Sequence, residues 1–123
     1  MEKEFVPYEL ALRMKQLGFN KPCFGYWYSE QELKKIDIQL ATIYFLEGEE
    51  DYILALTWQQ AFRWFREKHD LFYFIDFSGD GFCSGWEDLG NNQHGFENFK
   101  TYEKAELGCL EKLIEIVEQI KSE

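Results

Sequence analysis

The stretch TWQQAFRWFREKH, residues 57–69, is the strongest helix signal in the chain. Thr57 and Gln60 have the spacing of a capping box, in which a hydroxyl and an amide satisfy free N–H groups at the start of a helix. Apolar residues then recur at helical spacing and form one wide face: Trp58, Ala61, Phe62, Trp64 and Phe65. Because so wide an apolar face must be packed against other elements around most of the helix circumference, we expect this helix to lie at the centre of a compact core.

The composition indicates a folded, acidic protein. Aromatic residues make up 19% of the 123 residues, well above what a disordered chain carries, and the length fits one domain over residues 1–123. The net charge of −10 disfavours sequence-independent binding to DNA, RNA or anionic lipid.

The cysteines and the lack of long apolar runs point to the cytoplasm. Cys23, Cys83 and Cys109 are widely spaced, with no CxxC, which argues against a disulfide framework or a cysteine-rich zinc site and favours a reducing compartment. The start of the sequence, MEKEFVPYE, has no apolar signal segment, and no run is long enough to span a membrane. We therefore expect a cytoplasmic protein with no membrane partner.

The pattern along the chain alternates helices with pairs of strands. A first helix opens at Pro7, carries an apolar stripe of Leu10, Met14 and Leu17, and stops at Gly18. Before the central helix, the expected segments are a strand over 23–28, a polar turn over 29–35, a strand over 36–46 and a charged turn over 47–51.

After the central helix, we expect a hairpin, a loop and a last helix. The predicted segments are strands over 71–77 and 82–86 with Asp80 and Gly81 at the tip, an irregular loop over 88–99, and a helix from Thr101. One face of that helix should hold Tyr102, Ala105, Cys109, Leu113, Ile116 and Ile120, flanked by Leu110 and Val117. The resulting order, αββ–αββ–α, predicts an α+β domain: an antiparallel sheet of about four strands with three helices packed on it.

Three segments of the chain carry a resemblance to a known group. FVPYELALRMKQLGF followed by PCFGYW, QQAFRWFREK in the centre, and TYEKAELGCLEKLIEIV at the end together cover roughly half the chain. In combination they resemble a group of small, uncharacterised phage- and prophage-type proteins. The resemblance implies a mobile-element or gut-bacterial setting, and it brings no activity, cofactor or site residues.

Residues 76–87, DFSGDGFCSGWE, fit the spacing of a twelve-residue calcium loop. Asp76, Ser78, Asp80 and Glu87 would supply oxygen ligands, and Gly81 would allow the sharp turn. The flanks argue against this interpretation, because such a loop lies between two helices and residues 71–75 favour a strand. We expect a β-hairpin here, with calcium as the alternative and no other cofactor indicated.

The central helix also carries basic residues beside its aromatics. Trp58, Arg63, Trp64 and Arg66 could bind single-stranded nucleic acid through backbone charge and base stacking. The alternative is that the arginine stems cover the aromatic core while their charged ends stay in water. The net charge of −10 favours this alternative, so nucleic acid is not the expected partner.

Catalytic residue patterns are weak throughout the sequence. Cys23, Cys83 and Cys109 with His69 and His94 allow Cys–His pairs, but no spacing places a pair together. The cysteines are typical of small core residues. His94, in the predicted loop, is the one histidine that we consider as a candidate for a pocket. We therefore infer no catalysis.

The leading functional hypothesis is a small cytoplasmic accessory or interaction protein of phage type. Four Trp, seven Tyr and twelve Phe exceed what one small core covers, and surplus aromatics often mark an interface with a protein partner, including a second copy of the chain as a homodimer. The alternatives are calcium binding through residues 76–87 and an acidic decoy of a nucleic-acid-binding protein, which requires carboxylates in one continuous band.

Overall fold

A computed structural model describes residues 4–21, 25–29, 32–35 and 53–122. The predicted strand over 36–46, the charged turn over 47–51 and Cys23 lie outside the described residues. The chain divides into two compact units, residues 1–61 and 62–123. The expectation of a single domain over 1–123 stays a prediction.

The first unit begins with helix α1 (Tyr8–Gln16), which has the predicted apolar stripe. Leu10, Met14 and Leu17 are all buried. The sequence predicted Pro7 at the first helical position, but Pro7 is the N-cap residue and the helix itself begins at Tyr8. Gly18 ends the helix with a φ of 105°, a left-handed backbone conformation that glycine adopts without a steric penalty.

A three-stranded antiparallel sheet of order β2-β1-β3 follows in this unit. Its strands are β1 (Gly25–Ser29), β2 (Glu32–Lys35) and β3 (Ile53–Ala55). The prediction of a polar turn over 29–35 is wrong for residues 32–35, because β2 pairs with β1 there, from Gly25 opposite Lys35 to Ser29 opposite Glu32. Hydrogen bonding of the main chain holds this polar segment as a strand without the alternating apolar pattern that predicts one.

Helix α3 (Trp58–His69) confirms the prediction from residues 57–69. The backbone N–H of Thr57 donates to Oε1 of Gln60 at 2.9 Å, and the N–H of Gln60 donates to Oγ1 of Thr57 at 3.2 Å, so both halves of the capping box form. On the predicted apolar face, Ala61, Phe62, Trp64 and Phe65 are buried, and Trp58 is half-buried.

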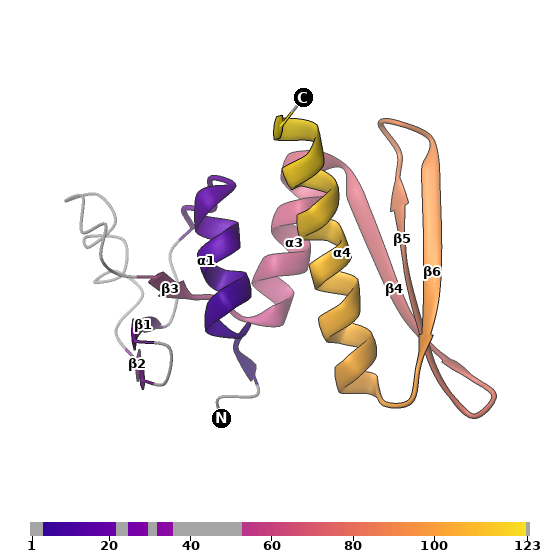
Figure 1. The fold of residues 1–123 in the computed structure, drawn as a ribbon, viewed down its shortest axis with the longest axis horizontal. Helices are drawn as coiled ribbons and strands as arrows, with labels where there is room; N and C mark the ends of the chain where they lie inside the picture. The colour runs from indigo at the N-terminus through magenta and orange to yellow at the C-terminus, as the bar shows by residue number, and fades with distance from the viewer. Residues whose placement is uncertain (1–3, 22–24, 30–31, 36–52, 123) are drawn as a thin grey trace. The chain divides into compact units, whose positions relative to one another are not determined.

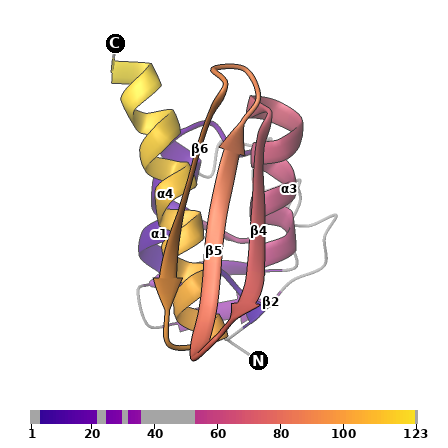
Figure 2. The ribbon, with the colours of Figure 1, turned by 90° about the vertical axis from the view of Figure 1, so that its right-hand side faces the viewer.

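The second unit is a three-stranded antiparallel sheet with a long helix against it. The strands β4 (Leu71–Ser78), β5 (Gly81–Asp88) and β6 (Gln93–Phe99) lie in sequence order, with β5 in the centre. Helix α4 (Tyr102–Ser122) runs along one side of this sheet (Figure 1) and lies behind it in Figure 2.

The hairpin predicted over residues 71–86 is confirmed, and its strands are longer than expected. Ser78 pairs with Gly81, so Gly79 and Asp80 form a two-residue turn, one position before the predicted tip. Gly79 has a φ of 54°, the left-handed conformation that such tight turns demand.

The irregular loop predicted over 88–99 is wrong for residues 93–99, which form β6. Only residues 89–92 form the turn, where the buried carboxylate of Asp88 accepts hydrogen bonds from the backbone and side-chain amides of Asn91 at 3.2 and 2.8 Å. Gly95 lowers the strand propensity of this segment, yet it is needed in the sheet: a Cβ there would lie 2.9 Å from Nε1 of Trp86 on β5.

Helix α4 begins one residue after Thr101, whose Oγ1 accepts a hydrogen bond from the N–H of Lys104 at 3.2 Å. The buried residues are Ala105, Cys109, Leu110, Leu113, Ile114 and Val117. The predicted face is thus correct for Ala105, Cys109 and Leu113 and for the flanking Leu110 and Val117. It is wrong at both ends, because Tyr102 is 44% exposed and Ile120 50% exposed, and near the C-terminal end Ile114 is buried whereas Ile116 is only half-buried.

The described residues therefore form an α+β protein, as predicted, but with two three-stranded sheets in place of one sheet of about four strands. The difference in the second unit comes from β6, which extends the predicted hairpin into a meander and completes the sheet that positions the candidate site.

Gly85, in the middle of β5, is a position where the sheet admits no side chain. A Cβ there would run into the ring of Phe74 and would lie 2.7 Å from the carbonyl oxygen of Gly95. We expect Gly85→Ala to lower the free energy of unfolding by about 1–3 kcal/mol, the usual range for overpacking. Urea denaturation measures this change.

The matched control is Gly90→Ala in the β5–β6 turn. A Cβ at Gly90 would meet Oδ1 of Asp88 at 3.5 Å, an ordinary contact, so the change should stay within about 0.5 kcal/mol. Equal stability of the two variants would contradict the packing described for Gly85.

Candidate interaction surface

The two faces of the β4-β5-β6 sheet have different environments. The face toward α4 is packed along the central strand: the ring of Phe99 lies against Gly108, Phe82 meets Tyr102 edge-to-face at 5.8 Å between ring centroids, and the Cys109 thiol lies 3.4 Å from the Gly85 carbonyl oxygen. Near the hairpin turn this face is uncovered, and Phe77 is 74% exposed there. Side chains alternate between the faces along each strand, so the strand register assigns every other residue to the opposite face.

We call that opposite side of the sheet the open face. Among residues 62–122 no helix lies on it, and Figure 2 looks onto it directly. Its residues are Phe72, Phe74, Asp76 and Ser78 on β4, Gly81, Cys83, Gly85 and Glu87 on β5, and His94, Phe96 and Asn98 on β6.

An aromatic row crosses the middle of the open face. Phe74 and Phe96 stand on the two outer strands, each opposite Gly85 in the register of the central strand. Their side chains are 45% and 69% exposed. Since full burial of one such ring is worth roughly 1.5–3 kcal/mol, the open face retains apolar area that a partner could cover.

Sequence reasoning missed these two phenylalanines, although the chain contains a signal for one of them. Residues 71–75, LFYFI, are apolar without alternation. A strand with one face in water usually alternates apolar and polar residues, whereas an unbroken apolar run is typical of a strand covered on both faces. Phe96 stands alone among polar residues on β6, so its sequence neighbours gave no signal.

Carboxylates lie in the rows on either side of the aromatic row. Asp76, in register with Cys83 and Asn98, is on the side of the hairpin turn, and Glu87, in register with Phe72 and His94, is on the other side. Both carboxylates are exposed. The strand residues of the open face include no lysine or arginine, so its fixed charge at neutral pH is negative.

The four residues of the candidate calcium loop do not converge on one point. Asp76 pairs with Cys83 and Glu87 pairs with Phe72, so the two carboxylates are four residues apart along the ladder, about 14 Å at the usual rise of a strand. A calcium ion binds oxygens at about 2.3–2.6 Å. Across the described residues, no group of three His, Cys, Asp or Glu side chains is arranged to hold a metal ion.

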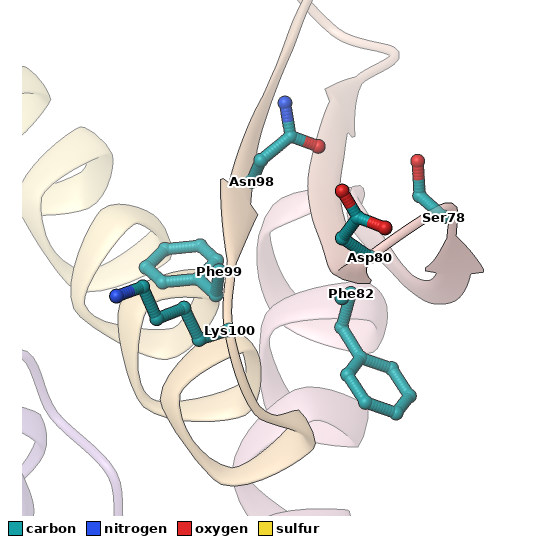
Figure 3. Close-up of a pocket in the computed structure, with 7 residues that line it drawn as sticks. Ser78, Asp80, Phe82, Asn98, Phe99 and Lys100 are labelled. Carbon is teal, nitrogen blue, oxygen red and sulfur yellow. The ribbon is translucent and has the colours of Figure 1, made fainter.

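Two of those four residues, Ser78 and Asp80, lie together at a cavity of about 370 Å³ beside the hairpin turn. Figure 3 shows the cavity, whose lining residues are Ser78, Asp80, Gly81, Phe82, Asn98, Phe99 and Lys100. Asp76 and Glu87 do not line it. Its lining combines polar and aromatic side chains with one acidic residue, Asp80, and one basic residue, Lys100. These residues do not form a recognisable catalytic set.

The basic and aromatic residues of α3 lie on different sides of the helix. Arg63 and Arg66 are exposed, whereas Trp64 is 5% exposed and packs edge-to-face on Phe65 at 5.0 Å between ring centroids. Trp58 is half-buried. Because base stacking needs an accessible aromatic face, the structure does not bring these four predicted residues together as a nucleic-acid site.

The described cysteines and histidines form no nucleophilic pair. Cys109 is buried on α4 beside Ser84, and burial raises the pKa of its thiol to about 12, so it stays protonated at neutral pH. Cys83 is half-buried on the open face in register with Asp76 and Asn98. His94, predicted in a loop, is exposed on β6 opposite Glu87.

The environment of His69, at the end of α3, lowers its pKa below 6.5. Burial is the largest cause, followed by the positive charges of Lys121 and Lys68. The ring packs edge-to-face with Trp64 at 4.9 Å between ring centroids, which places the imidazole in an aromatic setting. The pKa of the Glu106 carboxyl on α4 is raised, first by burial and then by Glu103.

Comparison with known proteins leaves the site to be interpreted from its own geometry. No protein-family model, no curated protein and no solved structure matches this chain. None of the described helices combines the length and the apolar character needed to cross a membrane.

Calcium should not stabilise this protein. Because Asp76 and Glu87 are held apart by the ladder, millimolar calcium should leave the melting temperature unchanged. Thermal unfolding with and without calcium measures this. If calcium bound, a concentration a hundred times its Kd would raise the free energy of unfolding by about 2.7 kcal/mol. An upward shift of the melting temperature that disappears in Glu87→Ala would therefore contradict the expectation.

Protonation of His69 should destabilise the fold at mildly acidic pH. Its pKa is lower in the folded than in the unfolded chain, so its contribution to stability is complete above about pH 6.5, the ordinary pKa, and is lost progressively as the pH falls from there through the lower pKa of the folded chain. Between pH 7.5 and 5.0, urea denaturation should show a larger loss of stability in the native sequence than in His69→Gln.

Comparing the two proteins isolates His69, because the effect of Glu106, which has the opposite sign, is common to both. The raised pKa of Glu106 gives stability below the ordinary carboxyl pKa that is lost as the pH rises through the folded value. An identical pH dependence in the two proteins would show that His69 does not titrate as described.

Proposed function

We propose that this chain is a small cytoplasmic accessory protein of phage type that acts by binding another protein through the open face of the β4-β5-β6 sheet. The aromatic row carries the proposal, because it leaves Phe74 and Phe96 exposed on a face whose opposite side is packed against α4. No catalytic step is assigned to the chain.

The position of the row supports a binding role over incidental exposure. Single exposed apolar side chains are ordinary on protein surfaces. Here two phenylalanines lie in one register row across three strands, and Phe72 follows on the same face. Aromatic side chains on a fixed β-scaffold lose little conformational entropy on binding and are enriched at the centres of protein interfaces.

The positions of the charged residues give less support to the two alternatives, an acidic decoy and calcium binding. An acidic decoy needs a continuous band of carboxylates, and in α4 the sequence intersperses Lys104, Lys112 and Lys121 with the glutamates. Calcium binding needs the ligands of residues 76–87 to converge, and the hairpin register separates Asp76 from Glu87.

Site-specific photo-crosslinking in the native cell tests the proposal. A benzoylphenylalanine replacing Phe96 should give a discrete adduct with a protein partner, because the ring would stand at the centre of the interface. The same replacement at Tyr102, an exposed aromatic residue on α4, is the matched control and should give little adduct. Equal yields at the two positions, or no adduct at Phe96, would contradict binding through the open face.

A further inference from the structure

The charge of the open face indicates the chemistry of its partner. Asp76 and Glu87 are the two acidic residues among its strand positions, and they flank the aromatic row on opposite sides. A partner that covered Phe74 and Phe96 with apolar groups alone would bring both carboxylates toward a less polar environment without compensation. Desolvating an unpaired charge is costly, so a well-matched partner supplies cations at both sides of its apolar centre.

We propose that the open face binds a cationic amphipathic protein segment, with apolar side chains over the Phe74–Gly85–Phe96 row and basic side chains beside Asp76 and Glu87. This inference rests on the proposed function and specifies its partner. Arginine suits both kinds of neighbour, because the guanidinium group pairs with carboxylates through two hydrogen bonds and stacks on aromatic rings.

The spacing of the carboxylates sets the geometry of the partner. Asp76 and Glu87 are four residues apart along the ladder, about 14 Å, on neighbouring strands. Two basic residues at this separation fit about two turns of a helix, at 5.4 Å per turn plus the reach of the side chains, with apolar residues on the intervening turn. An amphipathic helix meets this requirement.

A second copy of the chain is the less favourable occupant. Two open faces brought together around a twofold axis would place acidic residues from both copies at one interface, and each chain already carries a net charge of −10. Neither Lys nor Arg is present on the strand positions of this face to offset that repulsion. A cationic partner gains from the same charges that oppose self-association.

Fluorescence anisotropy with a labelled synthetic peptide of leucine and arginine in amphipathic helical order measures the binding. A peptide with glutamate in place of each arginine is the charge control. The arginine peptide should bind, with NMR amide shifts concentrated in β4, β5 and β6, and the glutamate peptide should bind at least about tenfold more weakly, a difference of about 1.4 kcal/mol.

Paired variants separate the local charge from the overall charge. Asp76→Asn with Glu87→Gln should weaken binding of the arginine peptide about three- to tenfold, as expected for two partly exposed ion pairs. Glu67→Gln with Glu115→Gln removes the same charge from exposed positions on α3 and α4 and should change binding less than twofold. Equal effects of the two double variants would overturn the assignment of the cations to the open face.

Phe96→Ala distinguishes failure of this inference from failure of the proposed function. If this variant loses peptide affinity about tenfold while both charge variants match the native protein, the face binds proteins but has no preference for cations, and only the present inference fails. If peptide shifts map to the helices, or the native protein sediments as a dimer that Phe96→Ala dissociates, the cationic segment is not the occupant. Unchanged circular dichroism and melting temperature show that each variant folds.

Discussion

The packing of α4 against the central strand β5 is the contact on which the second unit depends. The Cys109 thiol and the carbonyl oxygen of Gly85 are 3.4 Å apart, and Ser84 is buried beside them. Gly108 leaves room on the helix for the ring of Phe99, where a Cβ would collide with it. This close approach, together with the stacking of Phe62 of α3 on Tyr73 of β4, packs helices against one face of a three-stranded sheet and leaves the other face to the aromatic row. The difference between the faces, and thus the candidate function, follows from this packing.

The aromatic row is unusual because it uses residues that a folding core would normally retain. Leu71 is almost fully buried on the side of α4, whereas Phe74, three residues later on the same strand, is 45% exposed on the open face. Gly85 between Phe74 and Phe96 admits no side chain, so the ring of Phe74 lies over the main chain of β5. The result is a fixed apolar surface with carboxylates on both sides, which combines a geometric and an electrostatic requirement for a partner.

Local signals predicted much of this fold, and the misses have physical reasons. The capping box of Thr57 and Gln60 acts within a few residues and was predicted. The hairpin turn is equally local, but it was predicted at Asp80 and Gly81, one position after its place at Gly79 and Asp80. Strand β6 was missed because its stability comes from pairing with β5 and from the indole of Trp86 over Gly95, a contact between segments nine residues apart. The open face was missed because it depends on which side of the sheet α4 covers.

Hydroxyl-radical footprinting of the isolated protein tests the central claim, that Phe74 and Phe96 are exposed on the face of the β4-β5-β6 sheet opposite α4, because the oxidation rate of a phenylalanine ring follows its exposure to solvent. Among four phenylalanines, Phe96, at 69% exposed, should oxidise fastest, Phe74 more slowly, and the buried Phe62 and Phe65 on α3 slowest. Protection of Phe96 and Phe74 to the level of Phe65 would show that the face is covered and would contradict the account.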